Sequence, residues 1–257
     1  MKIGKRLIFI GLGLLSAQQT LAQQEQSRID GGRPDQTQGT SIVPEKMIQI
    51  ESGVRLQKNT RNNHNVYTHA YPDLTLRLGL LDWLELRFTG AIQDSVIQGQ
   101  DNRRISGTSP LAIGTRVYLW PAKGWFPEAA LTGQVTVPVG NNDLQPDNTK
   151  TQLRLGLSNQ LTRTVSLSYS LSYGWVPQET EKAYAANLVF KLSEKFDFYG
   201  EVFGNKQERA QAEHQADIGL LFYPKNNMQL DVAAGLGLNQ AAPDYFLTTG
   251  VSIRLPR

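Results

Sequence analysis

The side chains that could do chemistry in this chain are charged residues that alternate with apolar ones along short segments. Seven of them are basic: Arg55, Arg77, Arg87, Arg116, Arg154, Lys191 and Arg254. Seven are acidic: Glu51, Glu85, Glu128, Asp197, Glu201, Asp217 and Asp231. Fixed charges of both signs around one confined space can orient a polar solute. They can equally pair with one another and fill that space. The residues alone leave both alternatives open.

The two signs are unevenly distributed along the chain. Five of the seven bases precede residue 160, whereas four of the seven acids lie between residues 197 and 231. If the segments that carry them close into a ring, bases and acids face each other across its interior. An opposed field of this kind is typical of a selectivity element in a pore.

No other residue pattern points to catalysis or to a cofactor. The three histidines, His64, His69 and His214, belong to no catalytic or metal-binding motif. A Ser–His pair of a lipid hydrolase is an alternative, but serine is so abundant that chance would supply such pairs. The chain has no cysteine, which excludes disulfides, thiolate metal sites and a lipid-modified N-terminal cysteine. We predict no catalytic residue, no metal ligand and no cofactor.

The elements that carry the charges are predicted to be β-strands. Residues 165–175, VSLSYSLSYGW, alternate apolar or aromatic with small or polar residues without a fault. Period two over eleven residues indicates a strand with two unlike faces. About twelve such segments follow one another between residues 46 and 257. They predict an all-β, antiparallel, up-and-down transmembrane barrel, with lipid outside and a polar lumen inside.

The lengths of the connections support this fold. Tight links are expected near residues 82, 122, 163, 194 and 225, and longer polar loops at 57–69, 94–110, 138–150, 176–183 and 205–214. Outer-membrane barrels have short periplasmic turns and longer outer loops, so both termini are expected on the periplasmic side. The tryptophans, Trp83, Trp120, Trp125 and Trp175, all fall at predicted strand ends, where lipid meets water.

The first 22 residues have the order of a secretory signal peptide: three basic residues, a short apolar run, then small residues. They carry Lys2, Lys5 and Arg6 and no acid, so their removal lowers the formal charge from +3 to zero. A neutral chain gives no reason to expect nucleic acid as a partner. Residues 23–45 are polar and aperiodic, and they are expected to form an irregular periplasmic lead-in or a plug. After the leader no apolar run is long enough for a membrane helix.

A soluble barrel or a β-sandwich would also alternate, but it would place its apolar face inward and its charges outside. Here the non-apolar face is rich in Gly, Ser, Thr and Gln with sparse charges, which favours a lumen. In the soluble alternative Leu76, Leu86, Leu155 and Leu171 would pack together in a core.

Two segments resemble the outer-membrane transporter family named for the MetA pathway of phenol degradation. They are GRPDQTQGTSIVPEKMIQIESGV, residues 32–54, and TLRLGLLDWLELRF, residues 75–88. Residues 127–140, PEAALTGQVTVPVG, are similar to a further family strand. The resemblance implies an outer-membrane channel for small molecules, aromatic or hydrophobic ones among them, and carries over no catalytic residue.

The end of the chain resembles the C-terminal signal that the barrel-assembly machinery recognises, with Thr248, Gly250 and Ile253 at the expected spacing. It departs at Leu255, where the signal usually has an aromatic residue, and Pro256-Arg257 follow. We therefore expect a channel in the outer membrane of a Gram-negative bacterium, surrounded by outer-membrane lipids. Its expected selectivity element is the charged lumen row. The alternative is a non-conducting structural barrel, or one that binds through the loops at 57–69 and 94–110.

Overall fold

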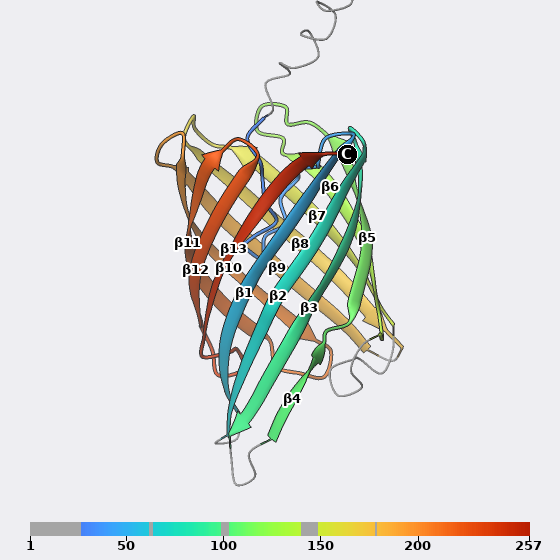
Figure 1. The fold of residues 1–257 in the computed structure, drawn as a ribbon, viewed down its shortest axis with the longest axis vertical. Coiled ribbons are helices and arrows are strands. Elements are labelled where there is room, and N and C mark those ends of the chain that lie inside the picture. The colour runs from blue at the N-terminus through green and yellow to red at the C-terminus, as the bar shows by residue number, and fades with distance from the viewer. Residues whose placement is uncertain (1–26, 62–63, 99–102, 140–148, 178) are drawn as a thin grey trace, which may run out of the picture.

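The computed structural model describes residues 27–257, apart from 62–63, 99–102, 140–148 and 178. The expected signal peptide, residues 1–22, lies outside the described residues. Within them the chain forms thirteen strands in one antiparallel sheet (Figure 1). The strands are β1 (Met47–Arg61), β2 (His64–Leu81), β3 (Leu84–Gln98), β4 (Arg103–Thr108), β5 (Leu111–Trp120), β6 (Glu128–Val137), β7 (Lys150–Gln160), β8 (Val165–Val176), β9 (Glu179–Lys191), β10 (Phe196–Gln207), β11 (Glu213–Lys225), β12 (Met228–Gly237) and β13 (Tyr245–Pro256).

Twelve of these strands close into a barrel, as the sequence predicts. Each pairs with its neighbours in the chain, and β1 pairs with β13 over Met47 to Lys58, which closes the ring. β3 pairs with β2 on one side and with β5 on the other. β4 pairs only with the far part of β3, over Ile92 to Ile97, on the same edge of β3 as β5, so it continues the line of β5 instead of adding a strand to the ring.

Several strands run further than predicted. Residues 57–61 and 64–69, expected in a loop, belong to β1 and β2, and much of 94–110 forms the end of β3 and β4. Similarly, β9 begins at Glu179, β10 ends at Gln207 and β11 begins at Glu213. The loop predictions were wrong here because water covers both faces of a strand beyond the membrane, so the backbone ladder continues without apolar alternation. A strand of about 9–11 residues crosses the hydrocarbon, so β1, β2 and β3, with 15, 18 and 15 residues, extend beyond it.

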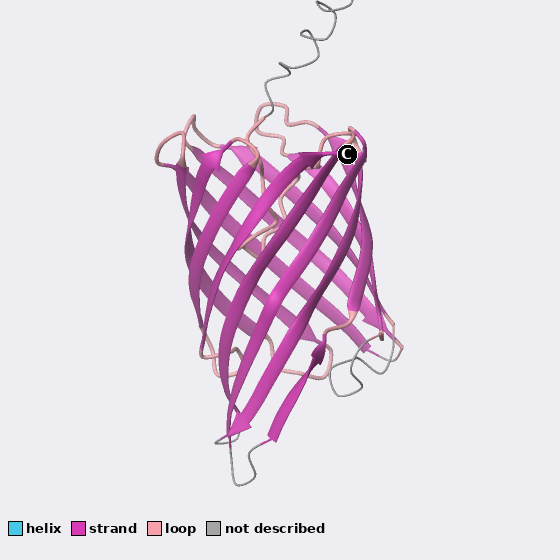
Figure 2. Cartoon of the chain, viewed as in Figure 1, coloured by secondary structure: helices cyan, strands magenta, loops and turns pink. Residues whose placement is uncertain are grey.

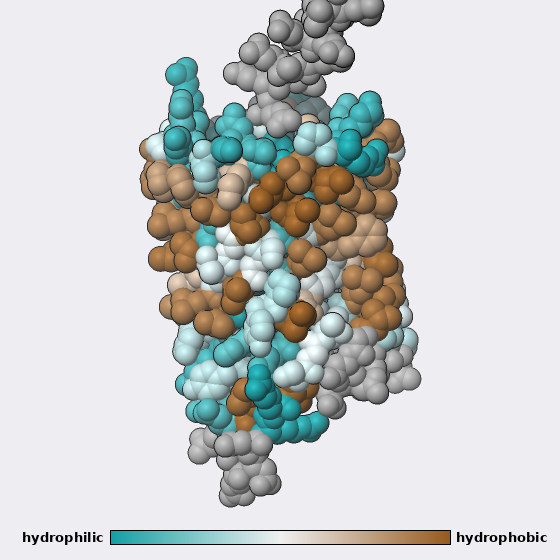
Figure 3. All heavy atoms as spheres, viewed as in Figure 1, coloured by the Kyte–Doolittle hydropathy of each residue, from teal (hydrophilic) through white to brown (hydrophobic). Residues whose placement is uncertain are grey.

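The outer face of the barrel is apolar. Leu171 is 63% exposed and Ile218 57%, whereas the residues that precede them, Ser170 and Asp217, are both buried. Figure 3 shows hydrophobic side chains gathered in a band around the strands, with hydrophilic residues at the two ends. The buried interior is polar: Arg77, Gln49, Glu51 and Glu85 are each at most 1% exposed. An apolar outside with a polar inside is the reverse of a soluble barrel and rules out that alternative. It is the arrangement of a transmembrane barrel. Among the described residues, no helix is long and apolar enough to cross a membrane.

The tight turns and the C-terminus share one rim, at the top of Figures 1 and 2. Four of the five predicted short links lie between strands that meet at this rim: 82–83, 161–164, 192–195 and 226–227. The fifth, predicted near residue 122, lies on the same rim and is longer, residues 121–127. From this rim residues 27–46, which we call the lead-in, run as a loop inside the ring of strands (Figure 2). The lead-in then turns at Lys46, whose φ is +61°, into β1.

Candidate functional site: a charged lumen around the lead-in

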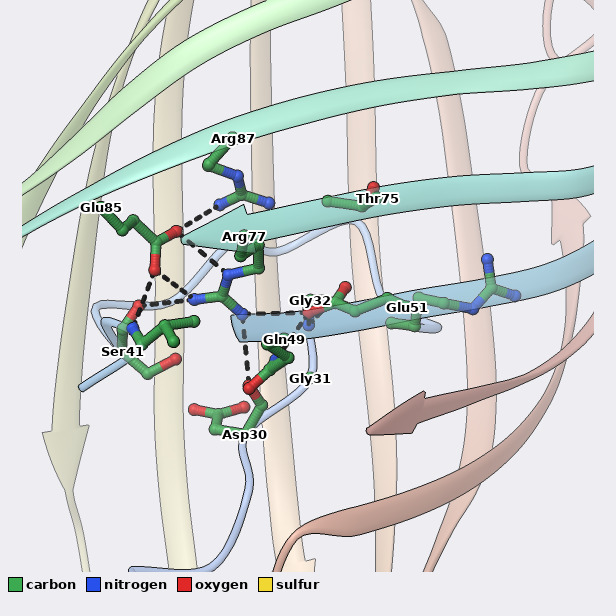
Figure 4. Close-up of polar contacts among 12 residues, drawn as sticks. Asp30, Gly31, Gly32, Ser41, Gln49, Glu51, Thr75, Arg77, Glu85 and Arg87 are labelled. Carbon is green, nitrogen blue, oxygen red and sulfur yellow. Dashed lines mark hydrogen bonds and ion pairs between the residues drawn. The ribbon is translucent and has the colours of Figure 1, made fainter. Parts of the chain in front are cut away.

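Arg77 is the centre of the most buried ion-pair network in the lumen (Figure 4). Its Nε and Nη2 donate to the two carboxylate oxygens of Glu85 at 3.0 and 2.9 Å, and Nη1 donates to Glu51 at 3.1 Å. The remaining two N–H groups donate to the carbonyls of Asp30 and Ser41, at 3.2 and 3.1 Å. All five guanidinium donors therefore have an acceptor.

The strand register explains why these side chains meet. Gln49 of β1 lies directly opposite Arg77 of β2, and Glu51 is two residues along β1, on the same face. Across the tight β2–β3 hairpin Glu85 lies opposite Gly79, again two residues from Arg77. Diagonal neighbours on one face of an antiparallel pair are within reach of long side chains. The network is thus a direct result of period two combined with this register.

The acids of the lumen bind backbone N–H groups of the lead-in. Glu51 accepts from Gly32 N at 3.0 Å and Glu85 accepts from Val43 N at 2.8 Å. On the opposite wall Glu201 accepts from the backbone nitrogens of Gln36 and Thr37 at 2.8 and 2.5 Å, and also from the Thr37 hydroxyl. Glu128 accepts from the hydroxyl of Thr40.

The basic and amide side chains of the lumen bind the oxygens of the lead-in. Arg116 donates to the Ser41 carbonyl at 3.1 Å and to the side-chain oxygen of Gln38 at 2.8 Å. Arg154 donates to the Gln36 carbonyl at 3.0 Å, and Arg254 donates to the Ser27 carbonyl. Gln49 and Gln229 each donate to a lead-in carbonyl at 2.9 Å.

These contacts explain the mixed sign of the lumen in a way that the sequence did not indicate. An irregular segment inside a barrel has unpaired N–H and C=O groups, and each is costly to bury without a partner. Carboxylates satisfy the donors, and guanidinium and amide groups satisfy the acceptors. Much of the charge that we expected to face a solute is committed to the lead-in.

The lead-in also contributes side chains to the lumen wall. Arg33 lies 3.2 Å from Asp73 and 3.7 Å from Asp231, and it donates to the Thr248 hydroxyl at 2.8 Å. Its guanidinium lies against Gly53, where a Cβ would lie 2.1 Å from Arg33 Nη2. Near the start of the lead-in, Arg28 pairs with Asp197, and its guanidinium lies 4.0 Å from the centre of the Tyr223 ring.

The fourteen charged residues of the predicted lumen row all line the lumen or its rim. Asp197 pairs with Arg28 and Asp231 with Arg33, and Lys191 lines the cavity at the tight-turn rim. Glu51, Arg77 and Glu85 come together in the network around Arg77, and Arg87 Nη1 lies 3.6 Å from Glu85. The residues that contact the lead-in are Arg116, Arg154, Arg254, Glu128 and Glu201. Asp217 lies directly opposite Glu201 across the β10–β11 pair. Its carboxylate is buried without a hydrogen bond within the described residues. Arg55 lies 4.3 Å over the Phe246 ring.

Sequence reasoning missed the lumen-facing aromatic residues. Phe203 and Phe246 are 8% and 0% exposed, with ring centroids 6.1 Å apart. The signal was present in the sequence. Phe203 is two residues from Glu201 and Phe246 two residues from Thr248, so each lies on the lumen face of its strand. It was missed because the lumen-facing row assigned from the sequence ended at Glu201 on one strand and began at Thr248 on the other.

The lead-in divides the free space of the lumen. A cavity of about 510 Å³ reaches Gln160, Arg163 and Thr164 at the tight-turn rim, and one of about 230 Å³ lies on the other side, lined by Arg87 and Gln152. The same lead-in residues line both cavities: Gly32, Arg33, Pro34, Asp35 and Gln38. A further cavity of about 210 Å³ lies toward the outer rim.

The histidines remain outside these cavities. His214 Nδ1 and the Tyr184 hydroxyl are hydrogen-bonded at 2.9 Å at the outer rim, so the partner of this histidine is not a serine. In the part of the chain that the structure describes, no cluster of His, Asp or Glu residues has the geometry to hold a metal ion.

Comparison with solved structures shows the same barrel in proteins of low sequence similarity. An outer membrane channel from Pseudomonas putida F1 is 12% identical, with a TM-score of 0.68 over 88% of this chain and 100% of that chain. The KdgM porin is 9% identical, with a TM-score of 0.54 over 80% and 98% of the two chains. The translocator domain of the autotransporter NalP from Neisseria meningitidis is 11% identical, with a TM-score of 0.53 over 96% and 95%.

A search of the curated proteins finds no match to this chain. The family comparison does find one. A family model described as "Putative MetA-pathway of phenol degradation" matches residues 31–255, from the lead-in to the last strand, and the chain therefore belongs to this family.

Proposed function

We propose that this barrel is an outer-membrane channel for small solutes, in which the lead-in forms a partition and the charged lumen provides selectivity. The observation that carries the proposal is the free space on both sides of the lead-in, about 510 Å³ toward the tight-turn rim and about 230 Å³ beyond it. A barrel with a purely structural role has no need of two polar cavities separated by one segment of chain.

The lead-in is held by polar contacts, which suits a partition that moves. Its hydrogen bonds to Glu51, Glu85, Glu201, Arg116 and Arg154 join groups that water can also solvate. The net free energy of such bonds is far smaller than their gross strength, because water replaces the lost partners. Displacement of residues 31–39 would join the two cavities into one path.

Conductance in planar lipid bilayers tests this function. We expect the wild type to conduct, and Arg116→Ala to conduct more, because it removes two contacts to the lead-in. Arg87→Ala should shift the permeability ratio toward cations, since Arg87 lines the outer cavity. Arg104→Ala is the control: this side chain is 67% exposed on β4, which extends past the ends of the other strands, and its loss should change neither property.

Absence of conductance and of solute uptake in the wild type and in both lumen variants would contradict the channel. The alternative is then a non-conducting barrel that acts through its outer hairpins. Its support is the extension of β1, β2, β3 and β4 past the other strands (Figure 1). In that case shortening the β1–β2 and β3–β4 hairpins abolishes function, and lumen substitutions leave it intact.

The remaining partners proposed for the barrel follow from its outer face and its last strand. Outer-membrane lipids cover the hydrophobic band of Figure 3. The barrel-assembly machinery recognises β13, where Ile253 and Leu255 flank the inward Arg254 on the outer face.

A further inference from the structure

The two cavities on the outer side of the lead-in share part of their lining. Gln36, Arg55, Gln152 and Arg154 border both the cavity of about 230 Å³ and that of about 210 Å³. We call the two together the outer vestibule. Each is smaller than the roughly 300–1,000 Å³ of a site for a drug-sized ligand. Each cavity by itself therefore suits a small solute.

Three arginines of the vestibule keep donors without a partner. Arg87 is 5% exposed, and its Nη1 has no hydrogen bond; its contact with Glu85 is 3.6 Å long. The oxygens of Glu85 already accept from Arg77 and from Val43 N.

The other two arginines are similar. Arg55 contacts the face of Phe246, and no described residue accepts a hydrogen bond from it. Arg154 uses only Nη1, for the Gln36 carbonyl. Arg55 and Arg154 are half-buried, and Arg87 is buried. A guanidinium that water reaches poorly and that lacks an acceptor is costly, so each of these donors is available to a ligand.

The acids that line the vestibule are, in contrast, already bound. Glu51 is held by Arg77 at 3.1 Å and by Gly32 N, and Asp73 by Arg33 at 3.2 Å. Glu181 lies 2.7 Å from Lys150, and Asp35 accepts from the amide of Asn187. Among the charged groups of the vestibule, the free hydrogen-bonding capacity is therefore that of cationic donors, which select carboxylates and other oxyanions. The side-chain oxygen of Gln215 is a neutral acceptor without a partner in the same lining.

An apolar aromatic surface lies beside these cations. Phe203 lines the part of the vestibule nearer the outer rim, together with Ala183 and Ala185. Phe203, Phe246 and Ala185 form a buried apolar cluster in a lumen that is otherwise polar. Aromatic rings favour offset or edge-to-face contacts with one another. A ring placed here would meet Phe203, with a guanidinium group of Arg55 or Arg154 next to it.

We propose that the outer vestibule binds a small aromatic carboxylate: the carboxylate accepts hydrogen bonds from Arg87, Arg154 and Arg55, and the ring packs on Phe203. The proposal rests on the channel function and gives it a substrate class. The apolar cluster is the reason to expect a ring in the ligand. The cationic donors that lack acceptors are the reason to expect a negative charge.

Isothermal titration of the full barrel in lipid nanodiscs tests the site directly, with benzoate as the probe. Benzyl alcohol is the matched neutral probe, and acetate the matched carboxylate without a ring. We expect saturable benzoate binding that Arg87→Gln with Arg154→Gln weakens by about tenfold or more, because charge-assisted bonds are lost. Phe203→Leu should weaken benzoate binding and leave acetate binding unchanged. Arg104→Gln removes the same charge outside the lumen and should have no effect.

Heat-modifiable migration of each variant on gels verifies that the barrel is folded. Absence of benzoate binding by the wild type overturns the proposal, as does an unchanged affinity in the folded double variant or equal binding of benzyl alcohol at the same site. Binding and conduction are separate readouts. Benzoate binding without conductance would support the binding site and contradict the channel. Conductance without benzoate binding would support the channel and contradict the binding site.

Discussion

At the scale of the residue, the lumen shows how a charge is tolerated where neither lipid nor bulk water can solvate it. Arg77 is 1% exposed, and each of its donors has an acceptor, two of them on Glu85. The desolvation of such a pair is offset only when geometry and additional hydrogen bonds are good. Removal of one member leaves the other buried and uncompensated, which costs more than the pair contributes.

Arg77→Met is therefore expected to destabilise the folded barrel by about 3–5 kcal/mol. Urea unfolding from lipid vesicles, followed by tryptophan fluorescence, measures the change. The double variant Arg77→Met with Glu85→Gln should regain part of the loss, because one of the two buried carboxylates is then neutral. Equal stability of Arg77→Met and the wild type would show that the network contributes nothing. Glu45→Gln, which breaks an exposed ion pair with Lys46, should leave the transition unchanged.

At the scale of the element, the lead-in depends on glycines where the strands come close to it. A Cβ at Gly79 of β2 would lie 2.0 Å from the Pro44 carbonyl oxygen and 2.5 Å from that of Val43. Any other residue must push the end of the lead-in away from the wall. The nearby bonds from Lys46 N to the Gly79 carbonyl and from Val43 N to Glu85 would then lengthen or break.

Gly79→Ala should for this reason raise single-channel conductance and make residues 27–46 accessible to added protease, without preventing barrel formation. Gly90→Ala is the matched control on β3, because its nearest neighbour, Leu111 Cδ1, would lie 3.9 Å from the new Cβ. If both variants fold and conduct like the wild type, the lead-in is no partition. Both variants replace a strand glycine by alanine, in adjacent strands. Any effect of the glycine-to-alanine change on strand stability is therefore common to both, and a difference between them reports on the lead-in.

At the scale of the whole molecule, the barrel is held in place by its outer surface. Leu171 is near the middle of β8 and 63% exposed, where the lipid tails are. Leu192, 62% exposed, lies in the turn after β9, at the rim. The two leucines are almost equally exposed, and they differ in how deep they lie in the membrane.

Leu171→Arg is expected to cost about 2–4 kcal/mol of folding free energy, and Leu192→Arg much less, because the penalty for a lipid-facing charge depends on depth. The folded fraction in vesicles across a urea series gives both values. Equal costs at the two positions would contradict the assignment of Leu171 to the membrane interior.

The sequence by itself determined the closed ring of twelve strands, the outer apolar face and the lumen-facing position of residues such as Arg77, Glu85 and Asp217. These properties follow from period two: a strand with one lipid face and one polar face has a single orientation that satisfies both. The same local rule accounts for the short links, since a two-residue turn such as Asp82-Trp83 leaves only a hairpin. The sequence did not reveal β4, because strands that pair in water do not need alternating apolar and polar residues.

Only the tertiary structure decided what the lumen charges bind. Arg77 and Glu51 are 26 positions apart, and Thr37 and Glu201 are 164 apart. No local pattern relates residues at such distances. Whether Glu201 meets an arginine, a solute or the backbone of the lead-in depends on which groups the closed barrel brings within about 3 Å, the range of a hydrogen bond. That proximity is a property of the closed ring and of the chain that runs inside it.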